Sequence, residues 1–508
     1  MNFKKILFFL FVFTTLNANA QDASDYKGER EKKHNLIHTK LKVDFNFKEK
    51  TMNGEAWVTV SPHFYATNKI SLDAKSMIIY QVSLNNIKLD YSYDDFDLEI
   101  TLPKEYTKAE EFTIYIKYKA QPEKVKDKLT NNITDAKGLY FINANGLDQK
   151  KPIQIWTQGE TQANSAWFPT IDAPNQKTTQ EIYITVPNKY KTLSNGTLEN
   201  QSVKGNLRTD YWKLDQKHAP YLAFMGVGEF EIVKDTYKNK IVNYYVEKEF
   251  APYAKDIFGL TPEMIGFFSD KLGIEFPWSK YSQIVVRDYV SGAMENTTAV
   301  VHGEEAYQKP GQLIDKNVHE KTIAHEIFHH WFGNLVTSES WSNVTLNESF
   351  ANYGEYLWIE HKYGKDAAEM HLFEQMDAYK KGQNESKSLV RFNYDDQESM
   401  FDLVSYNKGG VILHMLRKYL GDDAFFTGLK NYLTKYKFKS AEVHQLRLVF
   451  EELTGKDLNW FFNQWYYNSG HPDIEISYDY NTLRKTVTVN ITQLQANEFQ
   501  FPFTIDIF

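Results

Sequence analysis

Residues 325 to 329 read HEIFH, and two histidines four residues apart around a glutamate are the strongest candidates for chemistry in this sequence. Residues four apart lie on one face of a helix, so the His325 and His329 imidazoles would point the same way, one turn apart. Two imidazoles placed in this way can bind a divalent metal, and Glu326 beside them can hold a water without ligating the metal. Because HExxH also arises by chance, its context has to support this interpretation.

A catalytic zinc needs a third protein ligand and one open coordination position. Nineteen residues after His329, the segment TLNESFANYGE supplies Glu348 near the start of the next predicted helix. Two histidines and one glutamate suit zinc and leave the fourth position for water. Glu355 follows seven residues later on the same helical face, where it can accept the second ring N–H of a ligating histidine. We therefore expect one zinc ion per chain, bound by His325, His329 and Glu348.

The residues that flank HEIFH predict the helix that carries it. Asn317, with a glutamate three residues later, resembles a capping box, and Gly333 is a typical C-terminal stop. These signals predict a helix over residues 318–332. On such a helix His330 points about 100° away from His329, which makes it the weaker candidate ligand.

The period of the apolar residues divides the rest of the chain. Short segments between residues 35 and 245, such as KLKVDFNF and QEIYITVP, alternate apolar with polar residues, which is typical of antiparallel strands. Up to Gly470 the spacing is helical, and alternation returns afterwards. The sequence predicts a multidomain α+β fold: an N-terminal antiparallel β domain, a mainly helical catalytic domain and the beginning of a C-terminal β domain. Their expected ranges are 21–245, 246–470 and 471–508.

Residues 1–20 have the features of a secretory signal peptide. Lys4 and Lys5 precede an apolar run, and Ala18-Asn19-Ala20 forms a small-residue cleavage site. The run is too short to span a bilayer, and no other stretch reaches eighteen apolar residues. We therefore expect an exported protein without an integral membrane segment after signal cleavage, soluble in the periplasm or outside the cell.

The composition limits the chemistry further. The 508-residue chain contains no cysteine, which excludes disulfides, thiolate zinc ligands and thiol nucleophiles. Any metal must therefore be bound by histidine and carboxylate side chains. The net charge of −8 gives no indication of nucleic acid or of an anionic membrane as a partner.

Five motifs in fixed order resemble the aminopeptidase N family of zinc metallopeptidases, gluzincins whose relatives include leukotriene hydrolase. The resemblance implies a thermolysin-like catalytic domain, a following β-sandwich, and a zinc-dependent aminopeptidase that removes N-terminal residues from peptides. The motifs are TQGE (157–160), GAMEN (292–296), HEIFHHWFGN (325–334), LNESFANYGE (346–355) and YNKGG (406–410).

The resemblance also implies roles for individual residues. Glu326 would be the general base that takes a proton from the metal-activated water, and Tyr406 would donate its O–H to the developing oxyanion. Glu295 and Glu160 would bind the free α-ammonium of the substrate, with Gln158 as a polar neighbour. The remaining substrate-binding candidates are Gly292 and Ala293, which let a substrate backbone pair as an added strand, and Met294 in the first subsite.

The sequence departs from the family pattern in three places. Around the third ligand it lacks a second aromatic residue near Thr345 and has Ser349 where the family commonly has glycine. The segment NSAWFPTIDAP (164–174) lacks the basic residues that the family usually has there, so the contacts of an arginine are in doubt. The family's β-sandwich is usually followed by a helical domain that covers the active site, whereas the alternating pattern here only begins after Gly470. The sequence leaves open whether the chain is a fragment or the gene is short.

Two other functions fit part of the pattern. A zinc endopeptidase or epoxide hydrolase could use the same metal site, but Glu295 and Glu160 would obstruct a chain that continues past the amine. A non-enzymatic binding module is disfavoured because the ligands, the base and the tyrosine are all present. The first-subsite preference, the physiological peptides and the oligomeric state do not follow from the sequence.

Overall fold

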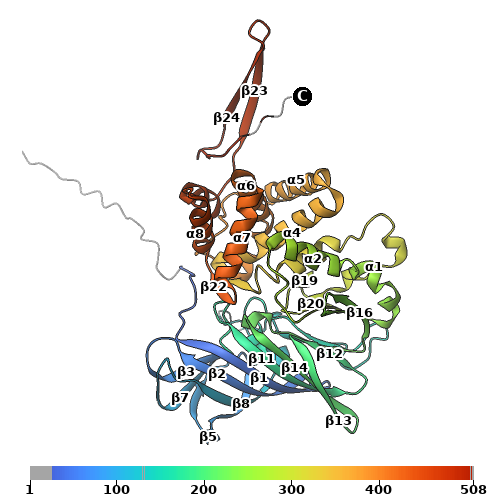
Figure 1. Cartoon of the computed structure of the whole chain (residues 1–508). Coiled ribbons are helices and arrows are strands. Elements are labelled where there is room, and N and C mark those ends of the chain that lie inside the picture. Colours follow the sequence, from blue (N-terminus) through green and yellow to red (C-terminus); the bar gives the residue numbers. More distant parts are fainter. Residues whose placement is uncertain (1–25, 129, 131, 504, 506–508) are drawn as a thin grey trace, which may run out of the picture.

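The computed structural model describes residues 26–128, 130, 132–503 and 505, and the predicted signal peptide lies outside this part of the chain. Figure 1 shows a β domain, a helical domain packed on it and a two-stranded hairpin that projects from the helical domain. This arrangement confirms the predicted multidomain α+β class.

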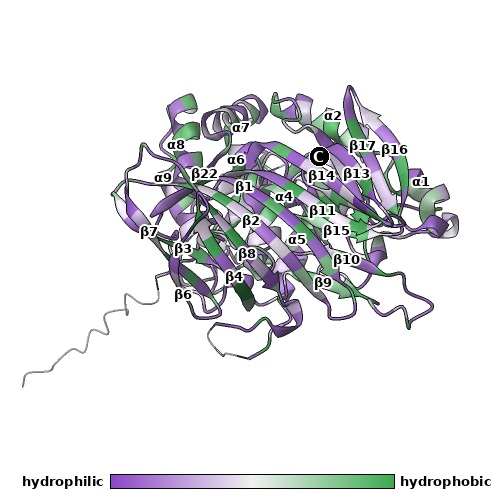
Figure 2. Cartoon of the chain, turned by 90° about the horizontal axis from the view of Figure 1, so that it is seen from below, coloured by the Kyte–Doolittle hydropathy of each residue, from purple (hydrophilic) through white to green (hydrophobic). Residues whose placement is uncertain are grey.

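The N-terminal domain is built on an eight-stranded sheet whose strands alternate buried and exposed side chains, as Figure 2 shows by their alternating hydropathy. Ile182 and Ile184 of β11 illustrate the pattern, because both are fully buried and their neighbours along the strand are not. All pairs are antiparallel except β1 with β11. The strand order is β13 (Thr197–Lys204), β14 (Leu207–His218), β11 (Thr178–Pro187), β1 (His34–Asn46), β2 (Thr51–Pro62), β8 (Phe112–Ala120), β4 (Met77–Leu84) and β5 (Ile87–Lys88).

Two smaller sheets complete this domain. The four-stranded sheet matters for the site, because the TQGE segment begins at the end of β10. Its order is β12 (Lys191–Ser194), β15 (Met225–Gly228), β10 (Gln154–Thr157) and β9 (Leu139–Ile142). The three-stranded sheet has the order β3 (Thr67–Asp73), β7 (Asp97–Tyr106) and β6 (Asp90–Tyr93).

A five-stranded sheet crosses the boundary that the sequence predicts at residue 245. The hairpin β16–β17 precedes this boundary, yet β17 pairs in parallel with β18, which follows it. Strand β19, which contains Ala293 and Met294, lies at the edge of the sheet. The order is β16 (Glu231–Tyr237), β17 (Lys240–Val246), β18 (Lys280–Val285), β20 (Ala299–His302) and β19 (Ala293–Met294).

The helical domain contributes most of the remaining elements. Within it, β21 (Val336–Ser338) and β22 (Lys439–Ala441) pair in parallel and form a two-stranded sheet. The helices are α1 (Ala254–Phe258), α2 (Thr261–Leu272), α3 (Glu320–Phe328), α4 (Thr345–Tyr363), α5 (Lys365–Lys381), α6 (Gly409–Leu420), α7 (Asp422–Tyr436), α8 (Val443–Thr454) and α9 (Asn459–Phe462), with π-helical turns η10 (Val404–Lys408) and η11 (Asn463–Tyr467).

Close packing fixes α4 against α3 and the turn that follows it. The rings of Phe332 and Phe350 stack with their centroids 4.1 Å apart. A Cβ at Gly354 would lie 2.7 Å from Phe328, so only glycine permits this approach of the two helices. The carboxylates of α4 are thereby positioned relative to the histidines of α3.

The predicted bounds of α3 are wrong, and its predicted capping box is only half formed. The helix spans Glu320–Phe328 rather than 318–332. The Asn317 side chain does accept a hydrogen bond from the His319 backbone N–H at 3.0 Å, but Glu320 does not complete the box. The Glu320 carboxylate instead accepts hydrogen bonds from Trp358 Nε1 and Tyr363 Oη at 2.6 and 2.8 Å. The backbone N–H of His329 still donates to the His325 carbonyl at 3.2 Å, so both histidines remain on successive turns.

The chain after Gly470 forms a hairpin of β23 (Ile474–Asn481) and β24 (Thr486–Gln493). It extends away from the helical domain in Figure 1, and Tyr478 and Ile491 on it are exposed. The alternation predicted from the sequence is therefore present, but most apolar side chains of the hairpin are uncovered. Across the described residues, none of the helices combines the length and the apolar character that a membrane span requires.

A buried histidine in the N-terminal domain predicts a pH effect on stability. His218 is fully buried, with Nε2 3.1 Å from Gln180 Oε1, and burial lowers its pKa to about 3. In the unfolded chain the pKa of this side chain is about 6.5. As the pH falls, the unfolded state therefore binds a proton here before the folded state does. The stability that neutral His218 contributes is thus complete above about pH 6.5 and is lost progressively towards pH 3.

We expect the His218→Gln variant, which keeps a side-chain N–H donor, to lose less stability on acidification than the parent. The difference between their free energies of unfolding should shrink between about pH 7.5 and pH 5. Urea titrations of the metal-free proteins measure it, and a difference that stays constant with pH would contradict the prediction.

Candidate active site

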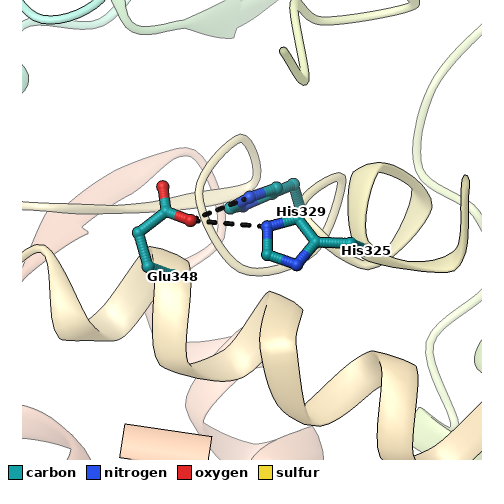
Figure 3. Close-up of side chains that lie close together, drawn as sticks. All are labelled: His325, His329 and Glu348. Carbon is teal, nitrogen blue, oxygen red and sulfur yellow. Dashed lines mark ion pairs between the residues drawn. The ribbon is translucent and has the colours of Figure 1, made fainter. Parts of the chain in front are cut away.

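Helices α3 and α4 bring together the three residues predicted to bind metal. The Oε2 atom of Glu348 lies 3.4 Å from Nε2 of His325 and 3.5 Å from Nε2 of His329. Figure 3 shows the two imidazoles turned towards this oxygen. All three side chains are buried, although Glu348 Oε2 has no hydrogen-bond partner among the described residues. An unpartnered buried carboxylate oxygen between two imidazoles is the arrangement that a cation would complete.

The distances and the second ring nitrogens fit zinc. Ligand atoms at about 2.0–2.1 Å from a tetrahedral zinc lie about 3.3–3.4 Å apart, which matches the two separations. Nδ1 of His325 lies 2.9 Å from Glu355 Oε1, and Nδ1 of His329 lies 3.0 Å from the Phe332 carbonyl. Both acceptors favour the tautomer with the proton on Nδ1, which leaves both Nε2 lone pairs free for a metal. The predicted contact of Glu355 is present.

His330 has no nitrogen left for a metal. Its Nδ1 lies 3.0 Å from the Glu326 carbonyl, and its Nε2 accepts a hydrogen bond from the Thr298 backbone N–H at 3.2 Å. Its ring also packs against Phe276 in the core. As the helical geometry predicts, the His330 side chain points away from the metal position and into the core.

Four carboxylates surround the metal position, of which those of Glu295, Glu326 and Glu348 are buried and that of Glu160 is partly exposed. Burial raises the pKa of Glu326, and the nearby charges of Glu295 and Glu348 raise it further against the opposing imidazoles. Burial opposes ionisation of Glu348 as well, yet His329 and His325 hold its pKa below the usual range. Glu326 Oε2 is buried and has no hydrogen-bond partner within the part of the chain that the structure describes. A carboxylate whose pKa is raised can take up a proton, whereas a carboxylate whose pKa is held low stays ionised.

Glu160 and Glu295 lie beside Glu348 and form the second half of the site. One carboxylate oxygen of each of the three lies within 4.8 Å of the other two. Burial, and then the charge of Glu295, raise the pKa of Glu160 well above its usual range, and burial also raises that of Glu295. Among the described residues, no lysine or arginine pairs with any of the three. Such a cluster favours a cationic ligand.

The other predicted substrate-binding residues line the same region. Gln158 is buried, and its Nε2 donates to Met294 Sδ at 3.4 Å. Ala293 and Met294 belong to edge strand β19, whose outer side has no strand partner among the described residues. A Cβ at Gly292 would meet no atom within 4 Å, so there is open space beside it. An extended peptide has both the room and an edge to pair with here.

Tyr406 reaches the site from the π-helical turn η10. Its ring stacks on the imidazole of His325, with centroids 5.9 Å apart and planes 14° apart. Burial, and then the charge of Glu348, raise the pKa of Tyr406 well above its usual range, so the phenol keeps its proton as a donor. A Cβ at Gly409 would lie 1.8 Å from Ser349 Oγ, so glycine is required where η10 meets α4.

Two tyrosines that sequence reasoning missed also contact the site. Tyr221 Oη donates to Glu295 Oε1 at 3.5 Å and accepts from Asn347 Nδ2 at 3.3 Å. Tyr289 Oη donates to Gln158 Oε1 at 2.5 Å. Both orient residues predicted to bind substrate. Among the 33 tyrosines of the chain, no local pattern distinguishes them.

Two family models match most of the chain. The model of the peptidase M1 N-terminal domain matches residues 32–222, and that of the peptidase family M1 domain matches residues 257–465. The second range includes HEIFH, Glu348 and Tyr406. The two models follow each other in the order of the two domains.

Curated relatives agree with the models. The glutamyl aminopeptidase of Sus scrofa is 30% identical over 351 residues, which are 67% of this chain and 37% of that protein. The probable aminopeptidase 1 of Saccharolobus solfataricus is 27% identical over 442 residues, which are 85% of this chain and 54% of that protein. The chain thus spans roughly two fifths to one half of the length of these relatives.

Solved structures have the same fold. An M1 zinc metallopeptidase from Deinococcus radiodurans, bound to a Tyr-Ser-Ala substrate, gives a TM-score of 0.73 at 20% identity, over 88% of this chain and 96% of that one. Legionella pneumophila aminopeptidase A, in complex with aspartic acid, gives 0.78 at 20% identity, over 93% of this chain and 53% of that one. The predicted resemblance to aminopeptidase N is confirmed, and the chain belongs to the M1 family of peptidases.

Proposed function

We propose that this protein is a zinc-dependent aminopeptidase that binds one zinc ion through His325, His329 and Glu348. The observation that carries the proposal is the pairing of two sites. In the first, the Glu348 oxygen lies at tetrahedral spacing from both imidazoles, and directly beside it lie the carboxylates of Glu160 and Glu295, which have no lysine or arginine partner among the described residues. The first suits a metal, and the second suits the ammonium group of a peptide.

The short distance between the two sites selects the first peptide bond. The α-nitrogen and the carbonyl carbon of one residue are only about 2.5 Å apart, given the bond lengths and angle at Cα. Because Glu160 and Glu295 reach within 4.8 Å of Glu348, an ammonium held by them leaves the first carbonyl at the metal position. The alternative endopeptidase would have to bury these two carboxylates against an uncharged chain, which is unfavourable.

The side chains divide the reaction among them. Bound zinc supplies Lewis acidity and lowers the pKa of water to about 7. Glu326, whose pKa burial raises, accepts a proton from the attacking water and returns it to the leaving amine. The protonated Tyr406 phenol donates a hydrogen bond to the developing oxyanion. Edge strand β19 aligns the substrate backbone.

The setting of this activity is also part of the proposal. The basic and apolar pattern of residues 1–20 supports export by a signal peptide, with peptide breakdown in the periplasm or outside the cell. The net charge of −8 supports peptides rather than nucleic acid as the partner.

Removing one ligand should remove the metal. We expect purified protein to contain about one zinc per chain and Glu348→Ala to contain much less, since two histidines alone leave an open, weak site. Elemental analysis after dialysis measures the ratio. Glu360→Ala on the same helix α4 serves as the control, because that carboxylate pairs with Arg417 instead. Full zinc content in Glu348→Ala would contradict the proposed ligand set.

A panel of chromogenic aminoacyl amides tests the function as a whole. The protein should hydrolyse several of them, lose activity after chelation and regain it when zinc is restored. A zinc-loaded protein that hydrolyses none of them would contradict the proposal. The panel also reveals which side chains the first subsite accepts.

A further inference from the structure

Helix α5 carries two polar residues that face the active site from behind α4. His371 and Gln375 are one helical turn apart on the same face. His371 is only 4% exposed, and neither residue belongs to a motif that carries the site. One of their contacts connects them to the proposed metal ligand His325, and another to the turn that carries Tyr406.

The first contact fixes the carboxylate behind the metal site. Glu355 Oε1 lies 2.9 Å from His325 Nδ1, and its other oxygen, Oε2, lies 3.7 Å from His371 Nε2. The carboxylate therefore lies between two imidazoles, one from α3 and one from α5. The His371 imidazole beside Oε2 restricts the rotation that would carry Oε1 away from His325.

The second contact reaches the turn that carries Tyr406. Gln375 Oε1 accepts hydrogen bonds from Asn407 Nδ2 at 2.5 Å and from Asn352 Nδ2 at 3.2 Å. Asn407 directly follows Tyr406 in η10, and π-helical turns are rare and need support from their surroundings. Gln375 Nε2 lies 3.5 Å from His371 Nε2, so the two side chains are direct neighbours.

A packing role alone does not explain this pair. His371 Nδ1 is buried without a hydrogen-bond partner among the described residues, which costs free energy that an apolar residue of similar size would avoid. His414 of α6 makes a useful comparison, because it is similarly buried at 6% and contacts Tyr353 Oη through its Nδ1. What distinguishes His371 is its link to the carboxylate behind a metal ligand.

We propose that His371 and Gln375 are positioning residues. His371 holds Glu355, which orients the metal ligand His325, and Gln375 holds the turn that carries the oxyanion donor Tyr406. Helix α5 thus fixes the positions of both groups. This inference rests on the proposed function. It assigns to His371 an effect on metal affinity, and to Gln375 an effect on turnover. Neither residue touches the substrate.

The His371 arm measures zinc binding directly, without substrate. Competition with a chromogenic chelator gives the dissociation constant of the zinc complex. Losing a direct outer partner of a metal ligand typically weakens binding about 10- to 100-fold, and we expect Glu355→Ala to fall in this range. His371 acts one contact further out, so His371→Leu should weaken binding several-fold, that is, less than Glu355→Ala. His371→Gln, which restores an N–H donor, should recover part of the loss, and His414→Leu should match the parent.

The Gln375 arm measures steady-state kinetics on a free aminoacyl amide. Gln375→Met keeps the length of the side chain but removes the acceptor of Asn407, so kcat should fall several-fold at unchanged KM, with zinc affinity near that of the parent. Gln375→Glu keeps the acceptor oxygen and should restore kcat. A structural defect would instead lower the melting temperature of Gln375→Met and of Gln375→Glu alike.

The outcomes separate this inference from the proposed function. Zinc affinity of His371→Leu equal to that of His414→Leu, or kcat of Gln375→Met equal to that of the parent, would overturn the inference while the parent remains an active zinc enzyme. A parent that binds no zinc or hydrolyses no amide would instead overturn the proposed function. If His371→Leu does not fold, the zinc affinity of His371→Gln relative to the parent and the Gln375 pair decide the question.

Discussion

Replacing Glu326 by glutamine is expected to lower kcat by about two to four orders of magnitude, the usual contribution of a general base. The amide has the size of the carboxylate but cannot accept a proton from water. Glu326 is buried, and its Oε2 has no hydrogen-bond partner among the described residues, so this oxygen is available to a water. Steady-state kinetics on a free aminoacyl amide measures the loss.

The metal content of the same variant provides the control. Glu326 is not among the three proposed ligands, so Glu326→Gln should retain about one zinc per chain, as the parent does. Tyr406→Phe should also retain zinc and lose turnover through a different step, the loss of one oxyanion donor. Near-parental kcat in Glu326→Gln with full zinc would show that another group acts as the base.

Replacing Glu295 by alanine should lower kcat/KM for substrates with a free amino terminus by roughly one and a half to three and a half decades. This corresponds to a loss of about 2 to 5 kcal/mol in the binding of the transition state. The α-ammonium would lose the buried one of two carboxylates that have no lysine or arginine partner among the described residues. Leaving a desolvated charge without its partner is the source of the cost. Initial rates of parent and variant at substrate concentrations well below KM measure kcat/KM.

An N-acetylated substrate provides the matched comparison. The unmutated protein should cleave it at least about a hundredfold more slowly, since the neutral amide cannot satisfy Glu295 and Glu160. Glu295→Ala should narrow this gap chiefly by slowing the free substrate. If the ratio of the rates on the free and the acetylated substrate is the same in the variant as in the parent, Glu295 does not bind the ammonium.

The sequence predicts which three candidate ligands lie together because much of the signal is local. His325 and His329 are related by one helical turn, and Glu348 and Glu355 by two, so helical periodicity alone places each pair on one face. The period of the apolar residues likewise predicts the β and helical domains. These are the features that depend least on contacts distant in sequence.

The rest depends on contacts that the sequence does not reveal. The local pattern predicts that Glu320 caps α3, but its carboxylate bonds to Trp358, 38 residues away. Tyr221 and Tyr289 contact Asn347 and Gln158 across 126 and 131 residues. The five-stranded sheet extends across residue 245 because β17 pairs with β18, which follows two helices later. In each case contacts between residues distant in sequence determine the structure, and local propensity does not predict them.

The most direct test of the account follows the products of one short peptide, with a free or an acetylated N-terminus, by mass spectrometry. A zinc site with two ammonium-binding carboxylates beside it predicts that the free peptide loses its residues one at a time from the N-terminus. The acetylated twin should remain intact over the same period, and a chelator should stop the reaction. Internal fragments from both peptides would contradict the aminopeptidase assignment while leaving the metal site in place.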